Sequence, residues 1–349
     1  MDVSIERPSA LSAAHRQAWQ AFQRENIQLA SPYFTLEFAD LCERVRPDTQ
    51  VCVVTTRGQV QGFLPFHAGR TGIARPLAGP LGDVHGLIEA EAGCLDAGHI
   101  IREAGLGVFE YHSALASQCG FSGAAELRDG SWQIELSQGF AAWQDNRRSL
   151  FPKAMRNLRA RRRRLEALDA GYEFVMDDRR PAVFEAMLAW KRQQYRETGV
   201  FDVFSVGWSH ALMRQVFETR TDALTGLSSA LYIGGRLAAV HIGMASDRLC
   251  HYWFPAYDRN LSHLSPGLLL LEEMIRAAAS MGHSGVELGP GDYQFKRELA
   301  TVQTGLVGGA LLGEGPVAGL RRTLRPLSGP GLRRRGWRKM DRLAGYHGL

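Results

Sequence analysis

Glu287 is the residue of this sequence best placed to move a proton. It lies between Val286 and Leu288 in a segment typical of an interior strand, and a Gly-Pro-Gly-Asp turn follows at once. A carboxylate buried in a strand is costly unless it is paired or used. Burial would raise its pKa and suit it to take a proton from an amine or hydroxyl. We therefore expect Glu287 to be the catalytic proton acceptor.

Asp292 and Lys296 are the next catalytic candidates, on the turn and short helix that follow. A spacing of four residues would place both side chains on one helix face, where they could pair. Lys296 could also stabilise a developing oxyanion or hold an anionic substrate. The alternative is a structural salt bridge that joins Glu287 or Asp292 to Lys296 or Arg297.

The triplet Ser265-Pro266-Gly267 is typical of a helix start. Ser265 can cap the helix, Pro266 suits the first turn, and Gly267 lets a ligand approach the backbone. The free N–H groups and the dipole at such an end favour a phosphate or a carboxylate. The alternative is a plain helix start, which most such triplets are.

Two histidines, His241 and His251, lie within expected strands. If side chains alternate along the second strand, His251 and Trp253 share one face, where they could form a cleft wall for a sugar ring. The alternative for both histidines is a hydrogen-bonded place in the core or on the surface. Asp83 and His85, in a glycine-rich loop of the first half, are expected to face a cleft between two domains.

Several familiar catalytic signatures are missing from the sequence. No histidine pair has the HxH or HxxxH spacing of a metal site, so we predict no metal. Neither a Walker-type phosphate loop nor a Gly-x-Ser-x-Gly nucleophile elbow occurs.

The net charge of +5 hides two strongly basic segments. Residues 147–164 hold nine Lys and Arg and no acid, and residues 321–342 hold nine against a single acid. The segments carry +9 and +8, which leaves −12 on the rest of the chain. Such asymmetry indicates an anionic partner.

The first basic segment is predicted to form one long helix over residues 145–168, because it is rich in Arg, Leu and Ala and has no proline after Pro152. Its cations would either pair with the acidic remainder of the chain or grip a phosphorylated donor or a lipid-diphosphate acceptor.

The second basic segment belongs to an Arg/Gly-rich tail over residues 316–349. Guanidinium groups bind phosphates bidentately, hydrogen-bond guanine edges and stack on bases. The tail could therefore bind a small guanine nucleotide such as cyclic-di-GMP, while an anionic membrane surface and an unstructured solubilising tail are the alternatives. The arginines expected to bind are Arg321, Arg325, Arg333, Arg334, Arg335 and Arg338.

A chain of 349 residues is long enough for two domains. Each half reads as helices, an antiparallel meander, then a helix and further strands, which indicates a duplicated α/β unit. We place the domains at residues 1–145 and 171–315, joined by a basic connecting helix over residues 146–170.

The sequence also indicates a compartment. The five cysteines are odd in number and widely spaced, which is typical of reduced thiols. There is no apolar leader and no run of about 20 apolar residues. We expect a cytoplasmic protein whose basic tail can also rest on the inner membrane.

Three features of the second half occur together. Tyr257 and Asp258 form a loop after a strand pair, the Ser-Pro-Gly triplet opens a helix, and an acidic residue precedes a Gly-Asp-x-x-Phe-Lys box at residues 291–296. In these features, and in the arginine-rich helix before them, the sequence resembles the CelD- or BioF2-like acyltransferase family, a FemAB-related branch of the GNAT superfamily. The resemblance is specific over about residues 150–300 and follows the layout of residues 1–312.

The resemblance implies an α/β (α+β) fold of tandem GNAT-like domains, with mixed, mostly antiparallel sheets flanked by helices. It implies acetyl-CoA or another acyl-CoA as donor, held by Ser265, Gly267 and Tyr257, with the C-terminal domain catalytic. It also implies a sugar or polysaccharide precursor as substrate, in bacterial exopolysaccharide or holdfast biosynthesis.

The sequence departs from the family at three points. Glu287 stands where Asp is usual, Phe295 stands where Tyr is commoner, and the Arg/Gln-x-x-Gly-x-Gly/Ala pyrophosphate loop is absent. The basic segment also lacks the partner hairpin of a coiled-coil arm, which argues against tRNA as a partner.

We therefore predict an N-acyltransferase, in the first instance an acetyltransferase, that modifies a sugar or amino-sugar of a bacterial surface polysaccharide. Regulation by cyclic-di-GMP through the tail is a further expectation. The alternatives are a degenerate GNAT protein with a nucleotide-responsive regulatory role and a FemAB-like aminoacyltransferase.

Overall fold

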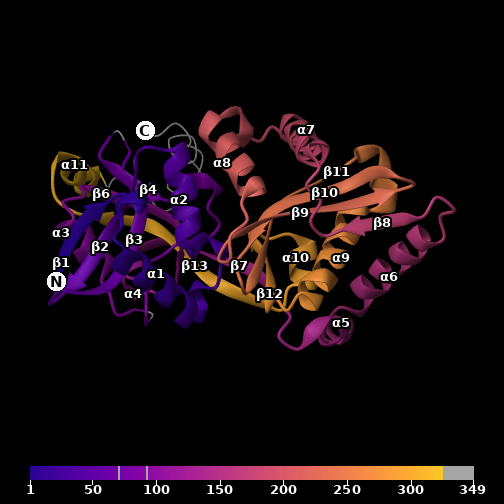
Figure 1. Cartoon of the computed structure of the whole chain (residues 1–349), viewed down its shortest axis with the longest axis horizontal. Coiled ribbons are helices and arrows are strands. Elements are labelled where there is room, and N and C mark those ends of the chain that lie inside the picture. Colours follow the sequence, from indigo (N-terminus) through magenta and orange to yellow (C-terminus); the bar gives the residue numbers. More distant parts are fainter. Residues whose placement is uncertain (70, 92, 325–349) are drawn as a thin grey trace. The chain divides into compact units, whose positions relative to one another are not determined.

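The structure of the chain is a computed structural model, and it describes residues 1–69, 71–91 and 93–324. Its contacts divide the chain into two compact units (Figure 1). The first unit comprises Met1–Ser131, Val206–Leu212 and the residues from Thr304 onward, and the second comprises Trp132–Ser205 and Met213–Gln303. Each unit carries mostly antiparallel strands flanked by helices.

The strands of the first unit carry its core. They are β1 (Asp2–Glu6), β2 (Thr49–Thr56), β3 (Gln59–His67), β4 (Ile73–Pro76), β5 (Ile88–Glu89), β6 (Val108–Leu115), most of β13 (Val302–Leu312) and most of β7 (Ala125–Glu135). Their order is β1-β2-β3-β4-β6-β13-β7, with β5 paired to β3. The pairs β1–β2, β2–β3, β3–β4, β3–β5 and β6–β13 are antiparallel, and β4 and β6 are parallel with Ile73 opposite Val108.

Helices cover this sheet with apolar faces. They are α1 (Ala13–Glu25), α2 (Leu36–Val45), α3 (Ala97–Glu103), α4 (Cys119–Ser122) and α11 (Pro316–Leu324). Trp19 of α1 is fully buried, and its ring centroid lies 5.0 Å from that of Phe63 on β3. Ala318 of α11 packs against Val108 and Ala310, so the beginning of the expected tail belongs to the fold of the first unit.

The strands of the second unit form a meander around its candidate site. They are the end of β7 (Ala125–Glu135), β8 (Tyr172–Val175), β9 (Thr225–Ile233), β10 (Arg236–Ala245), β11 (Leu249–Tyr257) and β12 (Gly285–Pro290), in the order β7-β12-β11-β10-β9-β8. The pairs β8–β9, β9–β10 and β10–β11 are antiparallel, and β11 and β12 are parallel.

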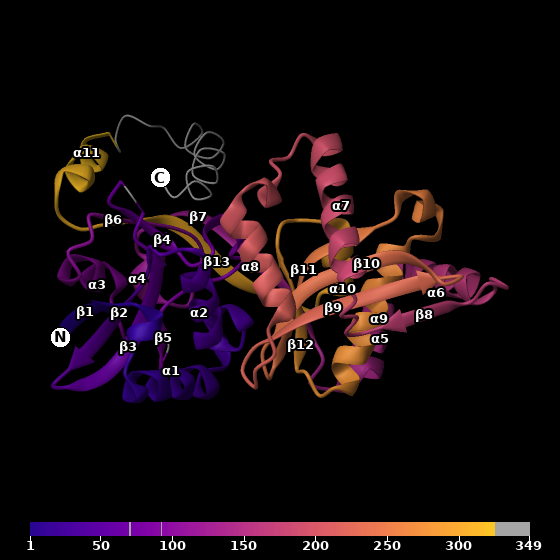
Figure 2. The ribbon, with the colours of Figure 1, turned by 45° about the horizontal axis from the view of Figure 1, so that its top comes forward.

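The helices of the second unit are α5 (Gly139–Leu150), α6 (Pro152–Glu166), α7 (Pro181–Thr198), the second half of α8 (Gly207–Glu218), α9 (Pro266–Ser280) and α10 (Gln294–Leu299). Figures 1 and 2 draw α7 and α9 on opposite sides of β9, β10 and β11. Buried side chains of α5, α6 and α9, such as Trp143, Leu158 and Met274, share one core with the strands. The buried face of α7 lies outside that core.

The basic segment forms two helices, α5 and α6, and the predicted single long helix is wrong. Phe151 interrupts it with φ −131° and ψ 60°, and Pro152 begins the second helix. The physical reason is the proline ring, which disfavours helical backbone at the preceding residue and suits the first turn of a new helix.

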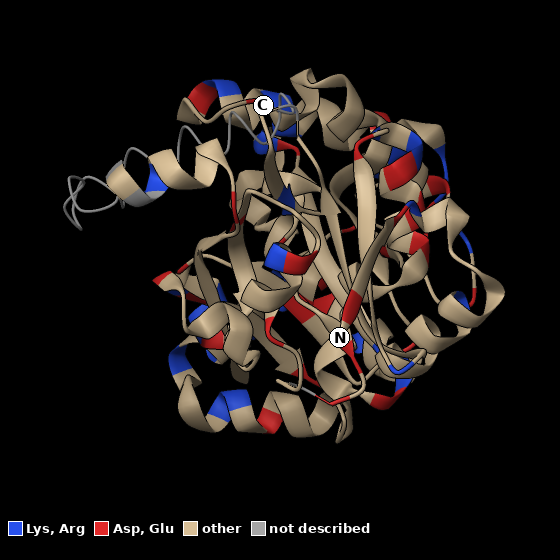
Figure 3. Cartoon of the chain, turned by 90° about the vertical axis from the view of Figure 1, so that its left-hand side faces the viewer, with Lys and Arg blue, Asp and Glu red and all other residues tan. Residues whose placement is uncertain are grey.

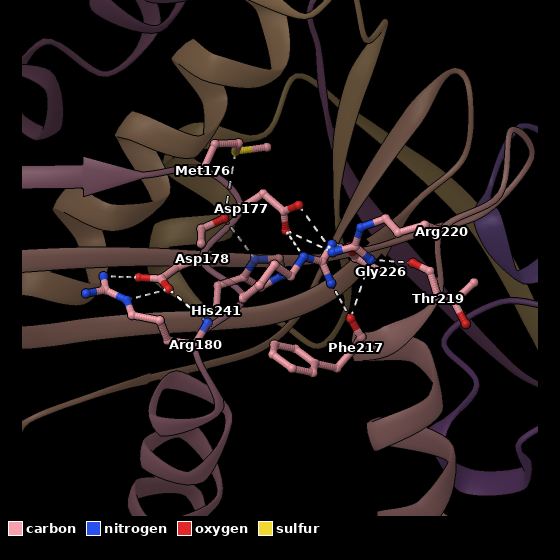
Figure 4. A network of polar contacts seen from close by, with 11 residues as sticks. Met176, Asp177, Asp178, Arg180, Phe217, Thr219, Arg220, Gly226 and His241 are labelled. Carbon is pink, nitrogen blue, oxygen red and sulfur yellow. Dashed lines mark hydrogen bonds and ion pairs between the residues drawn. The ribbon is translucent and has the colours of Figure 1, made fainter.

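A polar network ties the start of α7 to β9 (Figure 4). The buried carboxylate of Asp178 accepts hydrogen bonds from the Tyr232 hydroxyl at 2.6 Å and from Nε of Arg180 at 2.9 Å. Beside it, Arg220 donates to both oxygens of Asp177 at 3.2 Å. The Asp178–Tyr232 and Asp177–Arg220 pairs are not visible in the sequence, because their members lie 54 and 43 residues apart.

Asp178→Asn is expected to lower the free energy of unfolding by about 1–3 kcal/mol at neutral pH, because it weakens a buried, charge-assisted acceptor. The hydrogen bonds from Arg180, and then from Tyr232, hold the pKa of Asp178 below its ordinary value. A lowered folded-state pKa stabilises the fold above the unfolded pKa, and this contribution is lost as the pH falls through the folded pKa. The difference between wild type and variant, measured by denaturation at pH 7 and pH 3, should therefore shrink in acid.

The matched control is Asp222→Asn, because Asp222 is exposed. Its stability should stay within about 0.5 kcal/mol of wild type. If the difference in unfolding free energy between wild type and Asp178→Asn were the same at pH 7 and pH 3, the charge of Asp178 would not have the proposed role.

Candidate active site

The candidate active site lies where β11 and β12 stop pairing. Their parallel register joins Leu249 to Gly285, Cys250 to Val286 and His251 to Glu287. Pairing ends there, although β11 continues to Tyr257 and β12 to Pro290. The two strands therefore diverge directly after His251 and Glu287.

Glu287 and His251 come together at this divergence. The two residues are 9% and 1% exposed, and Nδ1 of His251 lies 3.6 Å from Oε2 of Glu287. The ring of Trp253, which is half-buried, follows on β11 with its centroid 6.0 Å from that of His251. Three residues that the sequence indicated separately thus share one site, with the imidazole of His251 beside the carboxylate of Glu287.

His241 supports β11 from inside the sheet. Its Nε2 lies 3.1 Å from the carbonyl oxygen of His251, and its ring stacks on Tyr252 with centroids 4.7 Å apart. Burial lowers the pKa of His241 to about 3, so the ring is neutral. Gly243 is required beside it, because a Cβ there would overlap the His251 carbonyl and the His241 ring. His241 is therefore a hydrogen-bonded histidine of the core, which was the alternative to a binding role.

Lys296 holds the turn that follows β12. Its ammonium group is buried and donates to the carbonyl oxygens of Gly289 at 3.0 Å and Pro290 at 2.7 Å. The exposed Asp292 pairs instead with Arg297 at 2.7 Å. The expected Asp292–Lys296 pair is wrong because α10 begins only at Gln294, so the helical spacing of four does not apply to Asp292. Asp292 thus forms the structural salt bridge that was the alternative to a catalytic role. A catalytic role for Asp292 or Lys296 stays a prediction.

The first turn of α9 meets an exposed aromatic ring. A Cβ on Gly267 would lie 3.4 Å from Cδ1 of Tyr257, whose residue is 43% exposed. Ser265 adopts φ 55° and ψ 47° and its side chain caps nothing, so the predicted serine cap is wrong. Capping serines take extended backbone, which aims the hydroxyl at the helix N–H groups, and the left-handed conformation of Ser265 does not. Ser265, Gly267 and Tyr257 nevertheless gather at one helix end, where backbone N–H groups favour phosphate.

Asp83 and His85 belong to the first unit. The half-buried His85 packs its ring edge on Phe121, with centroids 5.6 Å apart, and burial lowers its pKa well below the ordinary value. Their expected place at a cleft between domains stays a prediction.

Arg321 is bound within the first unit. It pairs with Glu110, which also binds Arg75 at 2.9 Å. The guanidinium expected to bind a nucleotide is thus already engaged by a carboxylate. The other arginines of that prediction lie outside the described residues: Arg325, Arg333, Arg334, Arg335 and Arg338.

Charges of both signs alternate over the elements of the first unit that face the viewer in Figure 3. Within residues 1–69, 71–91 and 93–324, no three His, Cys, Asp or Glu side chains gather as a metal ion would require. In the same ranges, no helix combines the length and apolar character needed to cross a bilayer.

Residues 152–297 match the family model described as an acetyltransferase (GNAT) domain. The match runs from the start of α6 into α10 and includes His251, Trp253 and Glu287. No curated protein sequence is similar to the chain at a significant level.

Solved structures with the same fold cover nearly the whole chain. FemX is 8% identical with a TM-score of 0.57, and the match covers 93% of this chain and 100% of FemX. A tandem GNAT protein from the clavulanic acid biosynthesis pathway is 12% identical, with a TM-score of 0.51 and coverage of 90% and 100%. The C-terminal domain of a putative lysylphosphatidylglycerol synthetase from Agrobacterium fabrum is 10% identical, with a TM-score of 0.51 and coverage of 89% and 96%. At these identities the similarity is one of fold, and it confirms the predicted tandem GNAT-like α/β architecture.

Proposed function

Starting from the GNAT acetyltransferase domain matched over residues 152–297, we propose that the second unit is the catalytic unit of an N-acyltransferase. The observation that carries this proposal is the buried Glu287 beside His251, where β11 and β12 diverge. Acyl transfer to an amine or hydroxyl requires that the attacking group lose a proton. Glu287 accepts that proton, and His251 keeps the carboxylate oriented toward the acceptor.

The donor in this proposal is acetyl-CoA or another acyl-CoA, the donor that GNAT domains generally use. It supplies the activated acyl group as a thioester. Gly267 binds its phosphates with its backbone N–H group at the start of α9, and the Ser265 hydroxyl lies beside it. The exposed ring of Tyr257 packs against that turn and offers an apolar surface beside it.

The acceptor in this proposal is an amino-sugar or sugar of a bacterial surface polysaccharide. Support comes from Trp253, because an indole beside an acid–imidazole pair can stack on a sugar ring and leave its polar groups free for hydrogen bonds. The resemblance of residues 150–300 to the CelD- or BioF2-like family favours the same substrate class.

The proposal is tested by thiol release from acetyl-CoA and longer acyl-CoAs, with amino-sugars, neutral sugars and amino acids as acceptors. Acyl-CoA should bind in calorimetry, and thiol release should depend on an amino-sugar. A protein that binds no acyl-CoA, and instead transfers an aminoacyl group from charged tRNA, would overturn the proposal in favour of aminoacyl transfer.

A further inference from the structure

The outer side of α6 carries cations that no described residue neutralises. Lys153, Arg156, Arg159, Arg163 and Arg164 are all exposed, and none has an ion pair within residues 1–69, 71–91 and 93–324. For these five residues, which we name the α6 basic face, the expected pairing with the acidic remainder of the chain is wrong. The helix turns them away from the body of the second unit.

Helix geometry explains why these cations share one side. At 100° per residue the five positions fall within an arc of about 140°. Met155, Leu158 and Leu165 lie on the opposite side and are buried in the core of the second unit. A helix of 15 residues is about 22 Å long, so the α6 basic face is a continuous strip of positive charge.

Few acids interrupt this strip. Within residues 139–168 the sequence contains only Asp145 and Glu166. Asp145 pairs with Arg148 on α5 at 3.1 Å, and Glu166 is the last residue of α6. Figure 1 draws α6 at the margin of the second unit, with no other element over its outer side.

We propose that the α6 basic face docks the protein on an anionic lipid bilayer. The five cations lie on a convex helix, so they suit a broad anionic surface. Each basic residue close to such a surface adds to the electrostatic attraction. Leu150, 59% exposed, stands at the junction of α5 and α6 beside the exposed Pro152. An exposed apolar group next to a basic face is able to enter the headgroup region.

The side chains between the cations favour lipid over nucleic acid. Proteins that bind single-stranded nucleic acid interleave cations with aromatic rings on which bases stack. Among the described residues of α5 and α6, Phe140 is half-buried and Trp143 is buried, and no aromatic side chain is exposed. The strip therefore offers charge and one apolar contact without a stacking platform.

The test is sedimentation of the full chain with vesicles of phosphatidylglycerol and phosphatidylethanolamine, and with vesicles of phosphatidylcholine alone. Only the anionic vesicles should bind, and binding should weaken as salt rises toward 1 M and the screening length falls to about 3 Å. Changing the five residues of the α6 basic face to Gln should weaken binding about 100-fold or more. Glutamine preserves helix propensity, and unchanged thermal unfolding would verify that the variant folds.

The matched control removes five other exposed arginines, all in the first unit, and should change binding less than about threefold. These substitutions are Arg7→Gln, Arg44→Gln, Arg57→Gln, Arg102→Gln and Arg128→Gln. Undiminished vesicle binding by the α6 variant, or an equal loss in the control, would overturn the proposal. Binding that disappears only when the chain ends at residue 324 would assign docking to the tail instead. Binding of a mixed-sequence RNA that depends on the α6 basic face, without vesicle binding, would also overturn it.

Discussion

Glu287→Gln should lower kcat/KM for acyl transfer by about 10²–10⁴-fold, the usual contribution of a positioned general base. The amide has nearly the shape of the carboxylate but cannot take a proton from the attacking amine. Since Glu287 lies on β12 and the donor phosphates are proposed to bind at the start of α9, acyl-CoA affinity should stay within about threefold of wild type. Steady-state thiol release and calorimetry with acyl-CoA would measure the two effects separately.

Glu185→Gln is the matched control for this experiment. The substitution again replaces a carboxylate by an amide, but Glu185 is exposed on α7, where it pairs with Arg214 at 3.0 Å. Its kcat/KM should equal that of wild type. If Glu287→Gln keeps a rate within a few-fold of wild type while acyl-CoA binds normally, Glu287 is a structural acid and another group accepts the proton.

Arg162→Met should destabilise the protein by about 3–5 kcal/mol, because it leaves the buried carboxylate of Glu272 without its cation. Arg162 of α6 donates from Nε to Glu272 at 3.2 Å and from Nη1 to Glu273 at 2.5 Å, both on α9. The side chain of Glu272 is only 4% exposed. Burial alone would lower the pKa of Arg162, but the two glutamates raise it overall, so the ion pairs persist across the physiological pH range. Denaturant unfolding of wild type and variant measures the loss.

The neighbouring substitution Arg163→Met is the control, since Arg163 is exposed and has no ion pair with the described residues. It should change stability by less than about 0.5 kcal/mol. The double variant Arg162→Met, Glu272→Gln should be less destabilised than Arg162→Met. A neutral amide then replaces the buried carboxylate that would otherwise have no cation beside it. Equal losses for Arg162→Met and Arg163→Met would show that the buried pair contributes nothing.

The sequence predicted the strands of the second unit and the acid at its centre. It indicated an antiparallel meander in this half, and the apolar neighbours of Glu287 indicated a buried strand. These are local properties, since a strand and its turn depend on residues a few positions apart. The association of Glu287 with His251 was not local, because it depends on the parallel register of β11 and β12.

Local reasoning failed where backbone geometry or a distant partner decided the outcome. Ser265 has the right residue type for a cap, but its left-handed backbone does not aim the hydroxyl at the helix. Lys296 follows Asp292 by four residues, but Asp292 precedes the helix, and two backbone carbonyls of the preceding turn hold the ammonium group of Lys296. The clash that requires Gly243 comes from His251 on the next strand, and the signal for it in the sequence is a glycine inside an otherwise regular strand.

The two basic segments also separate what the local sequence determines from what long-range packing determines. From the sequence alone, their composition determined that positive charge is concentrated at two places in a chain that is otherwise acidic. Only the tertiary structure decided which of those charges are already neutralised. Arg162 and Arg321 meet glutamates brought near by packing, 110 and 211 residues away, whereas the α6 basic face meets none among the described residues. The physical reason is that helix periodicity follows from residue type over a few positions, while the pairing of a buried charge requires a partner that only the complete fold brings within a few ångströms.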